Sequence, residues 1–194
     1  MQKLSADDEI RVWVAGCATG EEAYSLAILL HEHLTRLRRP LNVKIFATDV
    51  HQASLDIAGA GCYEREQLTD VSSERLKRYF SPKGSLYQVS AELRQMIVFA
   101  QHNVLKDAPF TRLNLVSCRN LLIYFEPGAQ KRAVSLFHFG LQPEGFLLLG
   151  PSEGLGDLED EFATLDRYWK LYRKRQHTRL LPVPDVQPPR ADSH

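Results

Sequence analysis

The spacing of apolar and polar positions predicts an opening strand, a tight turn and a long helix. The run Val12–Ala15 is apolar, as a strand buried on both faces requires, and Gly16 and Gly20 bracket the turn that follows it. Apolar residues then recur at steps of three and four, which predicts a helix of about five turns that ends at Pro40. The predicted apolar stripe of this helix comprises Ala23, Leu26, Ala27, Leu30, Leu34 and Leu37.

The run Val43–Thr48 is short and rich in β-forming residues, which predicts a second strand ending at Asp49. Residues 51–60 are expected to form a short helix, and residues 62–97 break the alternation of strands and helices as an insertion. Within the insertion we expect a helix over Ser73–Phe80, with Leu76, Tyr79 and Phe80 on one side. A turn at Pro82–Gly84 and a strand at Leu86–Val89 follow.

The alternation resumes after the insertion. Pro127 is suited to the first position of a helix, whose apolar stripe comprises Ala129, Ala133, Leu136, Phe137, Gly140 and Leu141. The strands expected in this half are Ile97–Ala100, Leu113–Cys118, the buried-type run Phe146–Leu149, and the pair Phe162–Asp166 and Tyr168–Tyr172 around a turn. The order of elements predicts an α/β fold with a Rossmann-like sheet, helices on both of its faces and a small inserted β-subdomain.

Length and composition bound the class of protein. The 194 residues are 44% hydrophobic and 25% charged, which fits one globular domain. We assign residues 1–9 to a leader, 10–175 to this domain and 176–194 to a disordered tail or linker. Lys and Arg total 24 against 24 acidic residues, so no net charge attracts nucleic acid or an anionic membrane. No segment resembles a membrane span or a signal peptide, so we expect a cytoplasmic protein.

The three cysteines are far apart and form no CxxC pair, which indicates buried thiols in a reducing compartment. His31 and His33 are two positions apart on a helix and do not match a zinc-binding HExxH motif. We therefore expect no metal site.

The first turn has the position of a nucleoside site without the features that bind phosphate. Its two glycines do not follow GxGxxG spacing, no Lys follows Gly20, and Glu21 and Glu22 place negative charge where a phosphate would lie. Asp49 ends the next strand, where an acidic residue meets ribose hydroxyls. This combination favours a neutral or cationic nucleoside. It disfavours a nicotinamide dehydrogenase.

A second interpretation of the same residues is structural. Thr19 and Glu22 have the spacing of a capping box, and Asp49 and Gln52 resemble another, so each pair could satisfy free N–H groups at a helix start. The sequence leaves both interpretations open.

Further polar residues follow two later strands. Because the carboxyl ends of strands line the ligand crevice of an open α/β sheet, we expect Asn103, Arg119, Asn120 and Tyr124 near the turn at Gly16. Simpler roles are also open: Asn103 could hold a turn, Cys118 could fill space, and Tyr124 could be a packed aromatic residue.

Taken together, Gly16–Ser25, Ala47–Asp49 and Cys118–Phe125 resemble the CheR-type chemotaxis-receptor glutamate methyltransferases, and Gly150–Glu153 is similar to that family's Gly-His-Ser-Glu stretch. The resemblance covers about residues 10 to 175. It implies an enzyme of the class I methyltransferase fold that takes S-adenosylmethionine (SAM), releases S-adenosylhomocysteine, and forms γ-methyl esters on glutamates of a receptor's cytoplasmic domain.

The resemblance also implies roles for individual residues. Glu22 and Asp49 would hold the ribose, Asn103 and Val104 the adenine, and Cys118 and Arg119 the region near the methionine. Arg119 and Tyr124 would lie closest to the transferred methyl group as catalytic residues. The cofactor-binding residues that we expect are Ala15, Gly16, Glu22, Asp49, Asn103, Val104, Cys118, Arg119 and Asn120.

The chain departs from the family pattern in two places. Family members carry an N-terminal helical domain that we expect to be absent here, so the chain resembles a fragment or one module of a larger methylesterase, methyltransferase and sensory fusion, whose flanking domains would be partners. Pro151 replaces the family's His, as in such fusions. The segment Phe80–Leu86 is short, so we expect no tight binding of a receptor's C-terminal pentapeptide. The competing hypothesis is a SAM-binding regulatory module without transfer activity.

Overall fold

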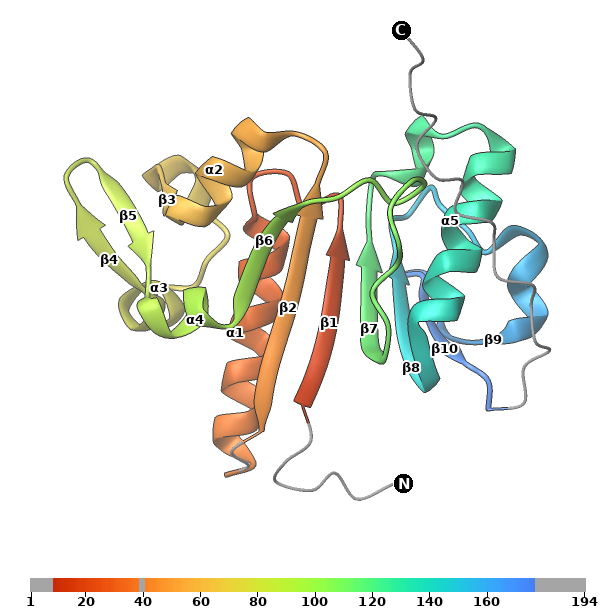
Figure 1. Ribbon diagram of the computed structural model, residues 1–194. Coiled ribbons are helices and arrows are strands. Elements are labelled where there is room, and N and C mark those ends of the chain that lie inside the picture. The colour runs from red at the N-terminus through yellow and green to blue at the C-terminus, as the bar shows by residue number, and fades with distance from the viewer. Residues whose placement is uncertain (1–8, 39–40, 177–194) are drawn as a thin grey trace, which may run out of the picture. The chain divides into compact units, whose positions relative to one another are not determined.

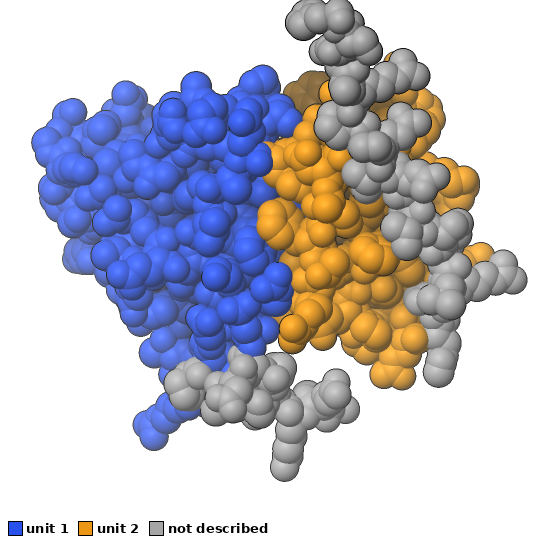
Figure 2. Space-filling view, viewed as in Figure 1, with its two compact units in different colours: residues 1–101 blue, residues 102–194 orange. Residues whose placement is uncertain are grey.

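The computed structural model describes residues 9–38 and 41–176, which divide between two compact units (Figure 2). Unit 1 comprises residues 1–101 and unit 2 comprises residues 102–194. The expected helix end at Pro40 and nearly all of the expected leader and tail lie outside the described residues.

Unit 1 contains a parallel sheet with the strand order β6-β2-β1 (Figure 1). Its elements are β1 (Glu9–Ala15), α1 (Glu21–Arg36), β2 (Asn42–Asp49), α2 (Gln52–Ala60), β3 (Cys62–Tyr63), η1 (Arg65–Leu68), α3 (Ser73–Tyr79), β4 (Phe80–Lys83), β5 (Leu86–Val89), α4 (Ala91–Gln95) and β6 (Ile97–Gln101). Each parallel strand is joined to the next through helical segments, as the predicted Rossmann-like α/β fold requires.

The first helix is present, but its buried face differs from the predicted stripe. Ala23 and Ala27 are buried as expected, whereas Tyr24 and Ile28 complete the buried face. Leu37 is 50% exposed because the helix ends at Arg36 and Leu37 is already its C-cap residue. The prediction from apolar periodicity therefore placed the end of the helix beyond the residues that are buried.

The insertion folds as a small antiparallel sheet with the strand order β3-β5-β4. The predicted helix is α3, but Phe80 belongs to β4 rather than to the helix, and β4 already contains Pro82. Pro82 is tolerated there because β4 is an edge strand. Gly84 adopts a positive φ of 63° in the hairpin turn that leads to the predicted strand at Leu86–Val89.

Unit 2 contains a sheet with the strand order β7-β8-β10-β9, in which β7 and β8 are parallel and β10 is antiparallel to both of its neighbours. Its elements are β7 (Leu113–Cys118), η2 (Leu122–Tyr124), α5 (Pro127–Gly140), β8 (Leu141–Leu149), η3 (Gly156–Glu161), β9 (Phe162–Asp166) and β10 (Leu171–Lys174). Pro127 occupies the start of α5, as predicted.

Two strands of unit 2 differ from their predicted bounds. β8 begins at Leu141 instead of Phe146, and its pairing with β7 shifts register where Glu144 takes a φ of 65°. Phe146 is exposed, so this run is not buried on both faces. β10 begins at Leu171 rather than at Tyr168, because residues 167–170 form the turn after β9.

A buried lysine closes the C-terminal end of α5. The Nζ of Lys174 donates hydrogen bonds to the carbonyl oxygens of His138 (2.7 Å) and Leu141 (2.8 Å), which satisfies acceptors that the last turn leaves free. Burial lowers the pKa of Lys174, while nearby Glu161 opposes that shift. Burial and the charge of Lys174 lower the pKa of His138 to about 4, so the imidazole is neutral at physiological pH.

None of the helices within residues 9–38 and 41–176 combines the length and the hydropathy needed to cross a bilayer.

We predict that Lys174→Met lowers the free energy of unfolding by about 1–3 kcal/mol, because two buried carbonyl oxygens lose their donor. Chemical denaturation followed by circular dichroism measures the change. The control is Lys106→Met, at an exposed position of the same unit, and it should stay within about 0.5 kcal/mol of the parent. Equal stability of the two variants would contradict a structural role for Lys174.

Candidate functional site

The turn after β1 is bonded to the end of β2. The backbone N–H groups of Gly16 and Cys17 both donate to the carbonyl oxygen of Thr48, at 2.8 and 2.9 Å. Gly16 and Gly20 have positive φ values of 73° and 94°. A Cβ atom on Gly20 would lie 2.8 Å from the Cβ of Ala58 in α2, so a larger residue at this position is excluded both by conformation and by space.

Asp49 connects two loops at the carboxyl edge of unit 1. Its Oδ2 accepts a hydrogen bond from the N–H of Ala18 (2.9 Å), and its Oδ1 accepts one from the N–H of His51 (3.0 Å). Each oxygen of an ionised carboxylate can accept a second hydrogen bond, so Asp49 keeps the capacity to bind a pair of hydroxyl groups. Glu22, in the first turn of α1, is half-buried at the same edge.

The capping-box interpretation of these residues is wrong. The N-cap of α1 is Gly20 and the N-cap of α2 is His51, and neither helix has a side-chain cap bond. The hydroxyl of Thr19 donates to the carboxylate of Glu21 instead of accepting from the helix. The positive φ of Gly20 directs the chain into α1 without the extended N-cap residue that a capping box uses.

Three carboxylates lie near the Cys17 thiol at this turn. The pKa of the Cys17 thiol is raised to about 12, mainly by burial, with further increases from the charge of Asp49 and from Glu22 and Glu21. The same carboxylates that oppose a thiolate favour a cation. The turn is therefore suited to a positively charged guest and unsuited to a phosphate.

The inserted sheet is bonded to the same turn through Tyr63 of β3. The hydroxyl of Tyr63 donates to the carbonyl oxygen of Thr19 at 2.7 Å, and burial raises the pKa of Tyr63. The hydroxyl of Tyr24 donates to the carbonyl of Ala58 at 2.8 Å. Sequence reasoning missed both contacts, because the partners are 44 and 34 positions apart and no local pattern connects them.

In unit 2, the end of β7 carries the second group of expected site residues. Cys118 ends the strand, pairs with Leu149 and is fully buried. Arg119 is half-buried and makes no hydrogen bond or ion pair with any residue that the structure describes. Asn120 is exposed and has a φ of 61°. Because Cys118 is fully buried, its thiol is not exposed to a ligand.

A buried carboxylate that sequence reasoning missed holds the loop after β7. The Oε1 of Glu153 accepts hydrogen bonds from the N–H groups of Leu121 (2.9 Å) and Leu122 (2.7 Å), and its Oε2 accepts one from Gly150 (2.6 Å). Glu153 was noted only as part of a family-like stretch, and its partners are 31 and 32 residues away. Its carboxylate thereby fixes the segment that carries Arg119 and Tyr124.

Tyr124, at the end of η2, is 79% exposed. The interpretation of this residue as a packed aromatic side chain is therefore wrong. Its hydroxyl is available to a ligand or to a protein that binds at this edge of unit 2.

Asn103 holds a turn, as the simpler interpretation proposed. Its Oδ1 accepts a hydrogen bond from the N–H of Leu105 (3.0 Å), and its own N–H donates to the carboxylate of Asp107 (2.7 Å). Val104 is buried. This role does not consume the side-chain NH₂ of Asn103, which can still donate to a base.

No group of three or more His, Cys, Asp or Glu side chains within residues 9–38 and 41–176 is placed to hold a metal ion. The cysteines are free thiols; Cys17 and Cys118 are buried as expected, whereas Cys62 is only half-buried.

We predict that one of the three cysteines reacts rapidly with a maleimide in the native protein at about pH 8. Cys62 should be the fast thiol, because Cys17 and Cys118 are buried and the raised pKa of Cys17 keeps its thiol protonated up to well above this pH. Mass spectrometry of the labelled peptides measures the order of reaction. Cys62→Ser should remove the fast phase, and rapid labelling of Cys17 would contradict the burial of its thiol and its raised pKa.

The chain is similar to known proteins over most of its length. Residues 1–171 match the family described as CheR methyltransferase, SAM binding domain. The chain is 46% identical over 167 residues to an uncharacterised 104.1 kDa protein of Rhodobacter capsulatus, and the match covers 84% of this chain and 18% of that protein.

Two further relatives carry methyltransferase names. The putative methyltransferase Cher3 of Pseudomonas putida is 38% identical, with 85% of this chain and 63% of that protein covered. The chemotaxis protein methyltransferase of Escherichia coli is 36% identical, with 80% and 56% covered. The chain therefore spans less than two thirds of the length of these relatives.

Proposed function

Because the chain belongs to the family of CheR methyltransferase SAM-binding domains, we propose that it binds S-adenosylmethionine and transfers its methyl group to glutamate side chains of chemotaxis receptors. The observation that carries the proposal is the acidic turn of unit 1, where Asp49 and Glu22 supply negative charge. A sulfonium nucleoside has the matching chemistry. We further propose that the acceptor is a receptor's cytoplasmic domain and that the reaction takes place in the cytoplasm.

We propose the following contacts between this chain and parts of the cofactor. In unit 1, Glu22 and Asp49 accept hydrogen bonds from the ribose hydroxyls, and the backbone of Ala15 and Gly16 lies against the nucleoside. Asp49 is suited to this role because each of its oxygens accepts one backbone hydrogen bond and can accept a second one from a hydroxyl group.

The remaining contacts are proposed from the residues that the sequence pattern singled out after residue 101. Asn103 and Val104 meet the adenine, with the NH₂ of Asn103 as donor. The backbone at Cys118, together with Arg119 and Asn120, meets the methionine portion. The fixed loop held by Glu153 supports this assignment, since positioning residues need a rigid carrier.

When bound, S-adenosylmethionine supplies a methyl group activated by a positively charged sulfur. A glutamate carboxylate is ionised at neutral pH and attacks without losing a proton, so the protein needs no general base. Its residues must align the carboxylate and remove water from two charges that cancel as the methyl moves.

Arg119 is proposed to position the acceptor carboxylate. An arginine that holds this carboxylate too tightly would stabilise the ground state and slow the attack, so its contribution lies in orientation. The exposed hydroxyl of Tyr124 is proposed as the second contact to the acceptor.

We predict that Asp49→Asn and Glu22→Gln each raise the dissociation constant for S-adenosylmethionine by about 10- to 100-fold, because each change removes a charged acceptor from the ribose. Isothermal titration calorimetry with S-adenosylmethionine and S-adenosylhomocysteine measures the effect. Asp56→Asn, on the exposed side of α2, is the matched control and should bind as the parent does. No heat of binding by the parent chain would overturn the cofactor assignment.

We predict that Tyr124→Phe lowers the turnover number about 10-fold or more while the affinity for S-adenosylmethionine stays the same, because only the hydroxyl is lost. Transfer of a radiolabelled methyl group to receptor cytoplasmic fragments measures turnover. Tyr87→Phe, in the inserted sheet, serves as the control. Equal methylation rates in the parent and in Tyr124→Phe would remove the proposed role, and binding without any transfer by the parent would favour a regulatory module.

A further inference from the structure

Two large aromatic side chains stand exposed at the turn between β9 and β10. Tyr168 is 78% exposed and Trp169 is 64% exposed. Their rings form a T-shaped pair with centroids 4.9 Å apart and an interplanar angle of 88°. Tyr and Trp at such a position are the residues that most often anchor protein interfaces, since each combines a large apolar ring with a polar atom.

The turn that carries the pair is held in place by its own hydrogen bonds. The N–H of Trp169 donates to the Oδ1 of Asp166 (2.9 Å), and the carbonyl oxygen of Lys170 accepts from the N–H of Leu149 at the end of β8 (3.1 Å). Lys170 has a φ of 54°, which closes the turn. An anchor on a fixed turn loses little conformational entropy when it binds.

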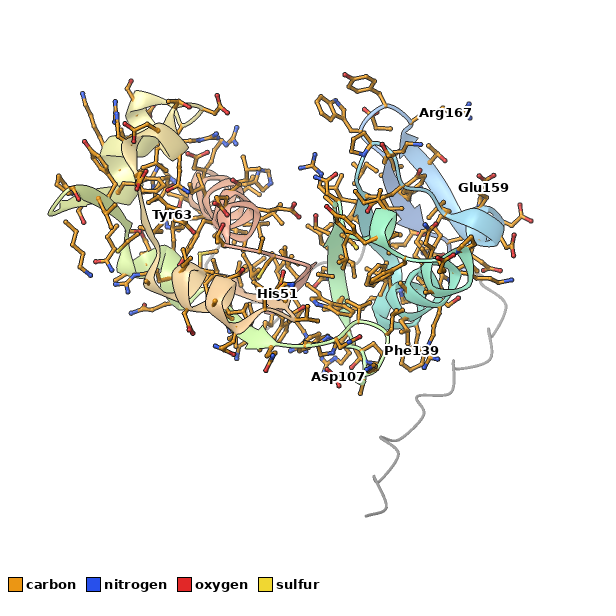
Figure 3. All side chains as sticks on the ribbon, turned by 90° about the horizontal axis from the view of Figure 1, so that it is seen from above. His51, Tyr63, Asp107, Phe139, Glu159 and Arg167 are labelled. Atoms are coloured by element: carbon orange, nitrogen blue, oxygen red, sulfur yellow. The ribbon has the colours of Figure 1, made fainter. Side chains whose placement is uncertain are left out.

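Strand register places this turn at the edge of unit 2 that carries the proposed acceptor contacts. Leu149, which is bonded to Lys170, pairs with Cys118 at the end of β7. Arg119 and Tyr124 follow Cys118 in the chain. The aromatic pair therefore belongs to the carboxyl edge of unit 2, and Figure 3 shows Arg167 at the tip of the hairpin.

The charges beside the pair select the kind of partner. Arg167 and Lys170 flank Tyr168 and Trp169 in the sequence, and Arg167 is exposed. The carboxylate of Asp166 on the same turn is engaged by the N–H of Trp169. An aromatic surface with basic flanks is complementary to an acidic protein segment that also exposes apolar side chains.

We propose that the Tyr168–Trp169 turn is a docking contact for the methyl-acceptor protein, and that it binds the acidic segment carrying the modified glutamate. This inference rests on the proposed function, because that function requires an acidic acceptor at this edge. The turn contributes binding energy for the acceptor and takes no part in the methyl transfer itself.

Direct binding can be measured separately from transfer, because the chain contains only two tryptophans and Trp13 is fully buried. Adding a receptor cytoplasmic fragment to the full chain should shift the emission of Trp169 to shorter wavelength and protect it from acrylamide. Trp169→Phe identifies the contribution of Trp13. Unchanged quenching of Trp169 at saturating fragment would overturn the proposal. A shift that depends on chain concentration without the fragment would do the same, since it would indicate a second copy on this surface.

Steady-state kinetics distinguishes a role in binding the acceptor from a role in methyl transfer. Trp169→Ala and Tyr168→Ala should each raise KM for the acceptor by about 5- to 20-fold, with kcat and the affinity for S-adenosylmethionine unchanged. Leu165→Ala, which removes another exposed apolar side chain from the same hairpin, should leave KM unchanged. Parent-like KM in both aromatic variants would overturn the proposal. If the parent binds the fragment with protection of Trp169 but transfers no methyl group, the proposed function fails while the docking surface stands.

Discussion

Carboxylate oxygens that accept backbone N–H groups at strand ends hold the loops that carry the residues proposed for the site. In unit 1, Asp49 accepts from Ala18 and His51 and so connects the loops after β1 and β2. In unit 2, Glu153 accepts from Leu121, Leu122 and Gly150 and fixes the segment after β7. Hydrogen bonds of this kind, between a charged acceptor and backbone donors, are stronger than those between neutral groups. Each loop is consequently held by a charged acceptor at more than one backbone position.

The carboxylates of Glu153 and Asp49 differ in whether their oxygens can accept further hydrogen bonds. Glu153 is buried and directs both oxygens to backbone donors, so its role is confined to support. Asp49 is half-buried and each of its oxygens can accept a second hydrogen bond, so the same group holds the turn and has the capacity to accept from a ligand. Burial is the main cause of the raised pKa of Cys17, and the charge of Asp49 raises it further. A cationic cofactor is thereby favoured by the residues that also give the turn its geometry.

The local sequence pattern predicted most of the helices and strands, although not all of their bounds. It did not predict the contacts between them. The strand ending at Asp49 and the helix starting at Pro127 followed from apolar runs and from the properties of proline. The N-terminus of α1 did not, because spacing suggested a cap by Thr19 where the structure uses the backbone freedom of Gly20. The roles of Tyr63 and Glu153 depend on partners more than 30 positions away, which no periodicity records.

The close approach of Gly20 to Ala58 limits how far the turn after β1 can move toward α2. With α2 pressed against the turn, this part of the backbone cannot yield inward, and its amides are already engaged with Thr48. If this turn holds the proposed nucleoside, its backbone is already in place and binding costs little reorganisation free energy.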